Sequence, residues 1–506
     1  MSFKDELATL IKARYPIVAL TSFEERRVEN IVQEIAKDQG KTLVIWTATR
    51  GFFGIDGKVI QSSAADLIEA LNQVISEAKS KKIIYLFKDI SRWLMDPQDK
   101  TYYRLLRDSV ETLKASQSTV LLLSPMFSYP REMEKIIQVL DVPYPDREEL
   151  KSVLERVVDA AKSVKSTIQS PTNGELDAIL RSGAGLTSDE FENIIAKSLV
   201  TQMKVDPRLV VLEKEQTIRK SGVLDYFQTV EGLEDIGGLD VVKAWITRRA
   251  LAFTQKAKDF GLRPPKFVFM CGVSGTGKSL SVKAMASYMK MPLLVVDASR
   301  LLGSFVGQSE QNLRSILKTA EAVSPAILFM DEAEKLLPQG TQGDSGVSSR
   351  IFGMLLTWVQ ENKKPVLLAM TANDPLKLPP ELFNRADATF FVDLPVKSER
   401  VEIWGIQIAK TGRDPKKFDL SLHAEESEGW SGREIENVCS EALARAFEAD
   451  HDIDTDTIRG VLKERVPLSV QRRDDTEKAR KWGKDFALPA STKGLSGEIG
   501  VRAVEF

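Results

Sequence analysis

The stretch Gly272-Val-Ser-Gly-Thr-Gly-Lys278-Ser279 decides the fold of the second half of this 506-residue chain. It fits the pattern G-x4-G-K-[ST] without a mismatch, and it stands between an apolar run, Phe267–Met270, and a helical stretch, Leu280–Lys290. The glycines let backbone N–H groups turn inward around phosphates, and the helix that follows adds its positive end. The stretch therefore predicts a phosphate-binding loop between a buried strand and a helix.

This loop predicts ATP and Mg²⁺ as cofactors. Lys278 would neutralise the β- and γ-phosphates, and the hydroxyl of Ser279 would bind Mg²⁺. The residues predicted to contact the nucleotide here are consecutive: Gly272, Val273, Ser274, Gly275, Thr276, Gly277, Lys278, Ser279 and Leu280.

A second motif supplies two carboxylates after a suitable gap. Residues 326–332 read Ala-Ile-Leu-Phe-Met-Asp-Glu, an apolar strand that ends in Asp331 and Glu332. Asp331 would bind Mg²⁺ through its water shell, and Glu332 would polarise the attacking water as a general base. Two acidic residues after a buried strand are also compatible with the solvated start of a loop, but the phosphate-binding loop upstream favours the catalytic interpretation.

Short apolar runs alternate with helical patterns in both halves of the chain. Each run is apolar on both faces, which is typical of a parallel sheet covered by helices on both sides. The runs are Ile17–Leu20, Leu43–Trp46, Ile83–Phe87 and Val120–Leu123 in the first half, and Phe267–Met270, Leu293–Val296, Ile327–Met330 and Val366–Met370 in the second.

The two halves also resemble each other. Gly185–Asn193 (GLTSDEFEN) matches Gly429–Asn437 (GWSGREIEN) in order and spacing. Upstream of each lies an apolar strand that ends at a proline, Pro143 or Pro395. The simplest interpretation is two copies of one unit, each an α/β core followed by a small helical lid. Chance similarity over a short helix start is the alternative.

From about Val230 to Ala449 the sequence resembles the AAA+ ATPase superfamily, and specifically its AAA clade. Residues 233–239 (LEDIGGL) are similar to the segment with which that clade holds adenine, which implies contacts from Asp235, Ile236 and Gly237. Thr371-Ala-Asn373-Asp374 is similar to sensor 1. There Asn373 would hold the lytic water and report the γ-phosphate.

Two arginines follow from the same resemblance. Residues 380–387 (PELFNRAD) resemble the arginine-finger region, although the stretch is two residues shorter than the family pattern. Counting back from the next strand puts Arg385 at the finger position. Residues 429–433 resemble the start of the sensor 2 helix, where Arg433 would touch the nucleotide. The AAA clade usually has a small residue there, so an ordinary exposed arginine is the alternative.

Two further segments resemble the pore loops of the family. Residues 302–310 (LGSFVGQSE) are similar to the first pore loop, and Phe305 holds the aromatic position that grips a threaded polypeptide. Packing of Phe305 in the core is the alternative. Residues 339–349, rich in Gly and Ser, resemble the second pore loop.

The first half has no recognisable nucleotide site. After Ile17–Leu20 the chain reads Thr-Ser-Phe-Glu-Glu-Arg-Arg, without a glycine to open the backbone, and Glu24 and Glu25 would repel phosphate. The run Ile83–Phe87 is followed by Lys88 and a single carboxylate, with no second acid to act as a base. We expect a degenerate AAA-like domain used for binding or assembly; an unrelated α/β domain is the alternative.

The predicted fold class is therefore α/β, an AAA+ phosphate-binding-loop core with a helical lid, preceded by a degenerate AAA-like domain with its own small helical domain. Residues 1–145 form the degenerate domain, 146–204 the small helical domain, 205–229 a linker, 230–394 the AAA+ ATPase core, 395–466 the helical lid and 467–506 a C-terminal helical tail.

Over its full length the chain resembles a family of AAA ATPases encoded as a hypothetical open reading frame in cyanobacteria and algal plastids. The degenerate first half and the ending with Pro467-Leu-Ser, Trp482 and Phe486-Ala suggest this. The resemblance implies a cyanobacterial cytosol or a plastid stroma, and a link to photosynthesis or its regulation. It names no substrate.

Composition excludes several other classes of protein. The formal net charge is −2, from 70 basic and 72 acidic residues, so no general affinity for nucleic acid is expected. Two cysteines exclude a disulfide scaffold, and neither of the two histidines stands in an HExxH zinc motif. No run approaches ~18 apolar residues, and the N-terminus lacks the character of a signal or transit peptide. We expect a cytoplasmic protein without a membrane span.

These patterns together predict an ATP-hydrolysing AAA+ motor subunit. The arginine finger implies hydrolysis at a subunit interface, hence self-association into a homo-oligomer, with a hexamer as the usual form in the superfamily. A ring that remodels an unknown protein client is the first hypothesis. An ATP-dependent regulatory switch or assembly scaffold without threading is the second, and a nucleic-acid motor is disfavoured by the balanced charge.

Overall fold

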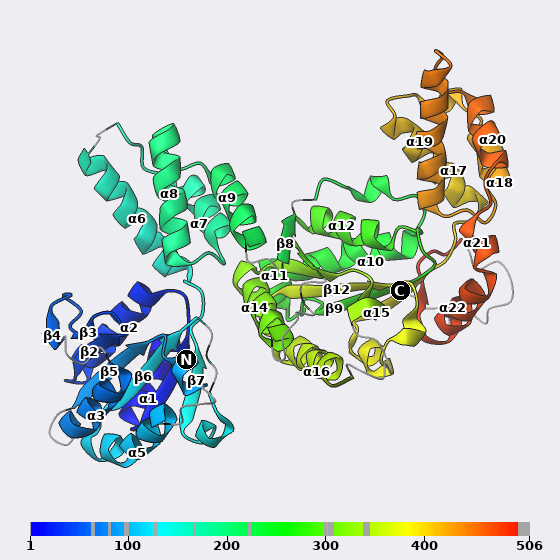
Figure 1. Cartoon of the computed structure of the whole chain (residues 1–506). Helices are drawn as coiled ribbons and strands as arrows, with labels where there is room; N and C mark the ends of the chain where they lie inside the picture. Colours follow the sequence, from blue (N-terminus) through cyan, green and yellow to red (C-terminus); the bar gives the residue numbers. More distant parts are fainter. Residues whose placement is uncertain are drawn as a thin grey trace. The chain divides into compact units, whose positions relative to one another are not determined.

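The computed structural model describes residues 2–61, 66–78, 82–95, 101–125, 127, 129–164, 167–220, 224–227, 229–297, 301, 308–336 and 345–493 (Figure 1). The chain forms two compact units, Met1–Pro207 and Arg208–Phe506, and each is described by itself. No described helix is both long and apolar enough to cross a membrane.

The first unit is built on a seven-stranded sheet with the order β4-β3-β2-β5-β6-β1-β7. Its parallel part runs from β2 to β7, while β3 and β4 are antiparallel additions at one edge. The strands are β1 (Ile17–Thr21), β2 (Thr42–Thr47), β3 (Gly51–Phe53), β4 (Val59–Gln61), β5 (Ile83–Lys88), β6 (Thr119–Ser124) and β7 (Ile137–Asp141).

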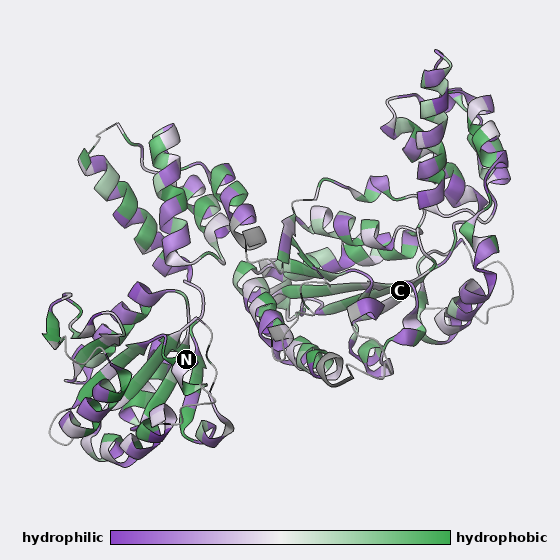
Figure 2. Ribbon diagram, viewed as in Figure 1, coloured by the Kyte–Doolittle hydropathy of each residue, from purple (hydrophilic) through white to green (hydrophobic). Residues whose placement is uncertain are grey.

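Helices cover both faces of this sheet because successive strand residues point to opposite sides. Ile17 and Ala19 of β1 pack with one core cluster, and Val18 and Leu20 pack with the other. Helices α1 (Phe3–Lys12) and α2 (Glu25–Asp38) cover the second face, whereas α3 (Leu67–Glu77), α4 (Ser91–Leu94) and α5 (Thr101–Ser116) cover the first. Figure 2 shows the strands as mostly apolar, whereas the helices carry both apolar and polar residues.

Three helices complete the first unit. They are α6 (Arg147–Val164), α7 (Asn173–Gly183) and α8 (Ser188–Gln202), and α6 packs against both of the others. Helix α8 begins at a capping box, in which the Thr187 hydroxyl accepts from the N–H of Glu190 and the Glu190 carboxylate accepts from the N–H of Thr187. A sequence pattern of this kind fixes where the helix starts.

The second unit has a sheet of the order β14-β13-β9-β12-β11-β10-β8. Helices α10 and α12 lie on one face, and α14, α16 and α22 (Arg473–Phe486) lie on the other. The strands are β8 (Leu224–Phe227), β9 (Phe267–Gly272), β10 (Leu293–Val296), β11 (Ala326–Met330), β12 (Val366–Ala372), β13 (Ala388–Val392) and β14 (Leu488–Pro489), and the helices of the core are α10 (Asp240–Ala250), α11 (Gln255–Phe260), α12 (Lys278–Met289), α14 (Gln308–Val323), α15 (Ala333–Leu336) and α16 (Ser345–Glu361).

The lid of the second unit is a helical bundle. It consists of α17 (Lys397–Lys410), α18 (Leu420–Glu426), α19 (Gly432–Glu448) and α20 (Thr455–Lys463), packed around the buried rings of Trp404 and Trp430. A helix begins within residues 429–433, as the resemblance implied, and Ser431 and Glu434 form a capping box at the start of α19.

The two units share one topology. Numbered in chain order, their five parallel strands stand in the spatial order 5-1-4-3-2, as β7-β1-β6-β5-β2 in the first sheet and β13-β9-β12-β11-β10 in the second. A helical bundle follows each core. The expectation of two related units is confirmed at the level of fold, and the alternative of an unrelated α/β domain is wrong.

Two predicted segments differ from the structure. Within 205–229, predicted as a linker, the chain forms helix α9 (Pro207–Lys220) and strand β8, which pairs antiparallel with β10 and buries Leu224 and Tyr226. The C-terminal tail contains α21 (Leu468–Gln471) and α22 (Arg473–Phe486), as helices were predicted, but β14 then adds a parallel strand beside β13. Both strands are too short for their alternation to be visible in the sequence.

Candidate nucleotide-binding site

The phosphate-binding loop lies between β9 and α12, as the sequence predicts. Its three glycines all have positive φ, 138° at Gly272, 78° at Gly275 and 95° at Gly277, which side chains other than glycine rarely adopt. A Cβ atom on Gly272 would lie 2.1 Å from the carbonyl oxygen of Val392. At these three positions no side chain stands between the backbone and a ligand, so the loop and the N-terminus of α12 can approach an anion closely.

Lys278 is held inside this loop by backbone carbonyls. Its ammonium donates to the carbonyl oxygens of Gly272 and Val273, at 3.0 and 2.6 Å, and the residue is only 6% exposed. Burial lowers the pKa of Lys278 to about 8, against the opposing effect of nearby acidic groups that include Asp331 and Glu334. The ammonium is thus already positioned in the loop. A bound anion would stabilise its charged form.

Ser279 and Asp331 meet across the end of the sheet. The hydroxyl oxygen of Ser279 lies 3.0 Å from each carboxylate oxygen of Asp331, and it donates its hydrogen to that group. The Thr371 hydroxyl, at the end of β12, donates to the same carboxylate. Hydroxyl and carboxylate oxygens beside a phosphate-binding loop form the donor set that Mg²⁺ prefers, with phosphate and water completing its six ligands. The residues therefore fit Mg²⁺.

Glu332 and Asn373 are also brought together. Glu332 has a left-handed backbone, with φ of 50°, and its N–H donates to Thr371 Oγ1 at 3.2 Å. The side-chain amide of Asn373 donates to Glu332 Oε1 at 3.2 Å, and Lys335 pairs with the other carboxylate oxygen. The carboxylate predicted as a base is thus oriented by the residue predicted as sensor 1.

Two residues near these acids were not assigned a role from the sequence. They are Thr371, which contacts Asp331 and Glu332, and Glu334, whose Oε1 accepts from the backbone N–H of Asn373 at 3.0 Å. The other oxygen of Glu334 is buried and has no hydrogen-bond partner among the described residues. In the sequence, only its position two residues after Glu332 pointed to a role for Glu334 in the site. Its partner Asn373 lies 39 residues further along the chain, so the contact itself could not be predicted.

The predicted adenine segment lies against the lid. Asp235 ends a short 3-10 turn, Ile236 is buried, and a Cβ atom on Gly237 would lie 2.4 Å from the side chain of Ile403 in α17. The N–H of the next residue, Gly238, donates to Glu402 Oε2 of the same helix at 2.8 Å. The segment therefore depends on the lid for its position.

The lid touches the phosphate-binding loop as well. The backbone N–H of Arg433, at the start of α19, donates to the carbonyl oxygen of Gly275 at 3.0 Å. The Arg433 side chain is exposed and has no hydrogen bond or ion pair with any described residue. The same holds for Arg385, which ends the 3-10 helix Pro380–Arg385. Both guanidinium groups are thus available to a ligand or to another chain, and their roles remain predictions.

The predicted pore loops cannot be compared in the same way. Phe305 and residues 339–344 lie outside the residues that the structure describes. Residues 345–349, predicted as the end of the second pore loop, begin helix α16 instead.

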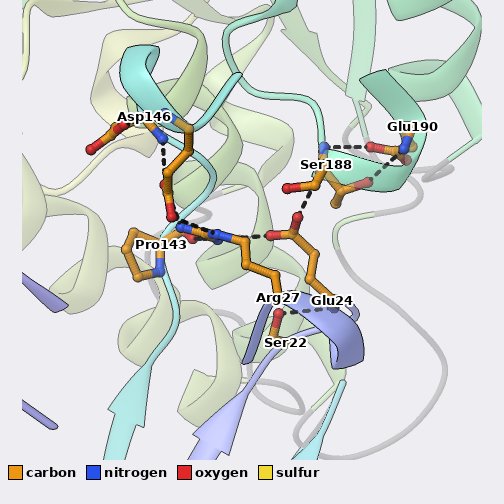
Figure 3. Close-up of polar contacts among 9 residues, drawn as sticks. Ser22, Glu24, Arg27, Pro143, Asp146, Ser188 and Glu190 are labelled. Atoms are coloured by element: carbon orange, nitrogen blue, oxygen red, sulfur yellow. Dashed lines mark hydrogen bonds and ion pairs between the residues drawn. The ribbon is translucent and has the colours of Figure 1, made fainter. Parts of the chain in front are cut away.

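In the first unit, the connection between β1 and α2 corresponds to the phosphate-binding loop, and side chains of the unit itself occupy this place (Figure 3). Only residues 22–24 join β1 to α2, against residues 273–277 in the second unit. Glu24 is buried, and its Oε1 accepts from the backbone N–H of Ser188, the first residue of α8, at 2.6 Å. A carboxylate of the protein thus lies at the start of the lid helix that corresponds to α19.

Arg27 connects this carboxylate to the helical part of the first unit (Figure 3). Its guanidinium donates to Glu24 Oε2 at 2.9 Å and to the carbonyl oxygen of Pro143 at 2.6 Å. It also forms two parallel hydrogen bonds with Glu149 of α6, at 3.0 and 2.8 Å. Core and helical part are joined by an internal ion network, which we call the Arg27 network (Glu24, Arg27, Glu149 and Ser188).

Family comparisons agree with this organisation. Residues 3–142 match the N-terminal domain of SpoVK-like AAA ATPases, and residues 148–221 match their second domain. Residues 268–394 match the ATPase family associated with various cellular activities, AAA. The fold and the site therefore define an ATPase of the AAA class, which hydrolyses ATP.

Similar proteins cover almost the whole chain. The AAA domain-containing protein ycf46 of Trieres chinensis is 32% identical over 98% of this chain and 100% of its own length. That of Pyropia yezoensis is 31% identical over 96% and 98%. The cell division cycle protein 48 homolog of Archaeoglobus fulgidus is 30% identical over 60% of this chain and 44% of its own length. The chain belongs to the ycf46 family of AAA domain-containing proteins.

The Arg27 network predicts the effect of a substitution on stability. Arg27→Ala leaves Glu24 buried without its cation, and breaking a buried pair in this way costs roughly 3–5 kcal/mol. We expect the free energy of unfolding of the first unit, measured from its transition in urea, to fall by about that amount. Arg26→Ala, at the exposed neighbouring position, is the matched control and should have little effect. Equal stability of the two variants would contradict the network.

The burial of Lys278 predicts a proton-linked affinity. The free protein holds this ammonium with a pKa of about 8, whereas a bound phosphate favours the charged form. Below that pH the lysine is charged before binding; above it, binding ADP must take up a proton and becomes weaker as the pH rises. Calorimetry at pH 8.5 in buffers of different ionisation enthalpy measures this uptake. Absence of proton uptake would show that Lys278 does not titrate there.

Proposed function

We propose that the chain is an ATP-driven motor subunit that works in a ring of identical chains, a hexamer, and remodels a protein client, with hydrolysis at the interface between neighbours. The observation that carries the proposal is the pairing of Glu332 with Asn373 beside the Ser279–Asp331 oxygens, because it combines a base, its orienting amide and a cation site at one end of a sheet.

The chemistry follows from these positions. The loop from Gly272 to Lys278 binds the phosphates, and Ser279 and Asp331 would hold Mg²⁺, which would supply charge neutralisation for phosphoryl transfer. Glu332 takes the proton of the attacking water, and Asn373 keeps the carboxylate and the water in line. Asp235, Ile236 and Gly237 hold the adenine. Arg433 donates its backbone N–H to the loop at Gly275, and its exposed side chain would contact the nucleotide.

Assembly is proposed from the exposed Arg385. Phosphoryl transfer needs a cation at the γ-phosphate, and an arginine supplied by a second subunit is one way to provide it. Arg385 is exposed and has no partner among the described residues of its own chain, which supports a role at a neighbour's site. A protein client fits better than nucleic acid, because 70 basic and 72 acidic residues leave no general cationic surface.

A switch or assembly scaffold without threading is the second candidate. The Arg27 network favours it, since the first unit is held closed without nucleotide and offers a static surface for a partner. Phe305 as the gripping residue supports threading instead. The cyanobacterial cytosol or plastid stroma, and a link to photosynthesis, stay proposals based on the family resemblance.

Removal of the base tests the active site. Glu332→Gln should bind ATP with little change and hydrolyse it at least about 100-fold more slowly, because general base catalysis contributes factors of that size. Phosphate release measures turnover and calorimetry measures binding. Glu448→Gln, at the exposed C-terminal end of α19, is the control for the loss of one charge. Normal turnover by Glu332→Gln would remove Glu332 as the base.

Mixing of variants tests the shared interface. Arg385→Ala should reduce turnover by about 1,000-fold while the affinity for ADP is retained, the effect typical of an arginine finger. Adding Glu332→Gln subunits should restore part of the activity, because they supply an intact arginine to neighbours with an intact base. If the mixture is as inactive as its components, hydrolysis does not take place between chains in this way.

A further inference from the structure

The last described residues of the chain lie directly behind the proposed adenine segment. After β14, residues 490–493 (Ala-Ser-Thr-Lys) pass between the start of α10 in the core and α17 in the lid. We call these four residues the C-terminal strap. Nothing in the sequence suggested this position, because its partners precede it by 91 to 252 residues.

The strap is anchored to the core through backbone and side chain. Ala490 donates its N–H to the carbonyl oxygen of Phe391 at 3.0 Å, which continues the pairing of β14 with β13. The N–H of Thr492 donates to Asp240 Oδ1 at 2.9 Å, and its hydroxyl donates to the other oxygen of the same carboxylate. Asp240 is the first residue of α10, so the strap is fixed just beyond the adenine segment.

The other contacts of the strap go to two carboxylates of the lid helix. The Ser491 hydroxyl donates to Glu399 Oε1, and the Lys493 ammonium lies 2.9 Å from Glu402 Oε1. The second oxygen of Glu402 accepts the N–H of Gly238 at 2.8 Å. The Glu402 carboxylate therefore joins the strap to the backbone at Gly238. While both contacts are made, its side chain is held in one orientation.

The backbone at Gly238 lies close against helix α17. Its φ is 69°, and a Cβ atom there would lie 2.4 Å from Glu399 Oε1. The hydrogen bond from Lys493 lowers the pKa of Glu402, so the acceptor of the Gly238 N–H stays an anion at neutral pH. A shift of α17 that releases Glu399 and Glu402 would free the backbone at 237–238.

We propose that the C-terminal strap is a positioning element for the adenine of the bound nucleotide: Lys493 and Thr492 lock Glu402 and α10 so that the segment 235–238 is preorganised. The inference rests on the proposed nucleotide site. Preorganisation raises affinity by removing the ordering cost of binding. Since the Lys493–Glu402 pair is about half exposed, it contributes little to folding itself, and its effect falls on the nucleotide.

The test compares two ligands in the full-length protein. Calorimetry gives the dissociation constants of ADP and of inorganic tripolyphosphate, which occupies the phosphate-binding loop without an adenine. Lys493→Gln should weaken ADP binding by about threefold, and Lys493→Gln with Thr492→Val by about tenfold, whereas binding of tripolyphosphate stays the same. Lys493→Arg should retain the affinity for ADP. Lys481→Gln, on the exposed side of α22, is the matched control.

Hydrogen exchange gives a readout that is independent of nucleotide. The amide of Gly238 should exchange faster in the double variant than in the wild-type protein, with both free of ligand. Unchanged affinity for ADP, or an equal loss for ADP and tripolyphosphate, overturns the role of the strap, as does unchanged exchange at Gly238. A wild-type protein that binds neither ligand would instead refute the proposed nucleotide site, and the strap proposal with it.

Discussion

The approach of the backbone at Gly272 to the carbonyl oxygen of Val392 is the constraint on which the second unit depends. No side chain fits between them, since a Cβ atom would lie 2.1 Å from that oxygen. The loop that follows starts from this close contact, in which the Val273 N–H also donates to the Val392 carbonyl oxygen at 3.1 Å. The first unit has the same strand order, yet only residues 22–24 at this place, and Glu24 lies where an open loop would be. Loop length and side-chain volume, more than fold, separate a nucleotide site from a closed one.

Charge around the loop explains why the site needs a cation besides Lys278. The charges of Asp331, Glu332 and Glu334 all favour the charged form of Lys278. Its ammonium also donates hydrogen bonds to two carbonyl oxygens. A triphosphate adds further negative charge to this group of carboxylates. A divalent cation, which Ser279 and Asp331 would hold under the proposed function, would offset that repulsion. The hydrogen bond from the Thr371 hydroxyl holds the Asp331 carboxylate in the orientation in which it meets Ser279.

Much of the core could be predicted because its signals are local. The run predicted at Phe267–Met270 is the body of β9, and the loop motif directly precedes α12. Strands β8 and β14 escaped prediction because four and two residues carry no readable alternation, and only pairing with β10 and β13 makes them strands. The contacts of Arg27 with Glu149, and of the strap with α10 and α17, join residues far apart in the sequence, so they follow from tertiary structure alone.

The two lids show what nucleotide can change. In the second unit the lid meets the core at the Gly275 carbonyl oxygen of the phosphate-binding loop and at the Gly238 N–H, which follows the segment predicted to hold adenine. Bound phosphate and adenine would add contacts to both, so ligand state can shift the lid by differential affinity. In the first unit the same junction is already made by Glu24, Arg27 and Ser188. A ligand could compete only by breaking a buried ion pair, which is costly. We therefore expect ATP-dependent motion in the second unit, and a first unit whose core and helical part stay joined whether or not nucleotide is bound.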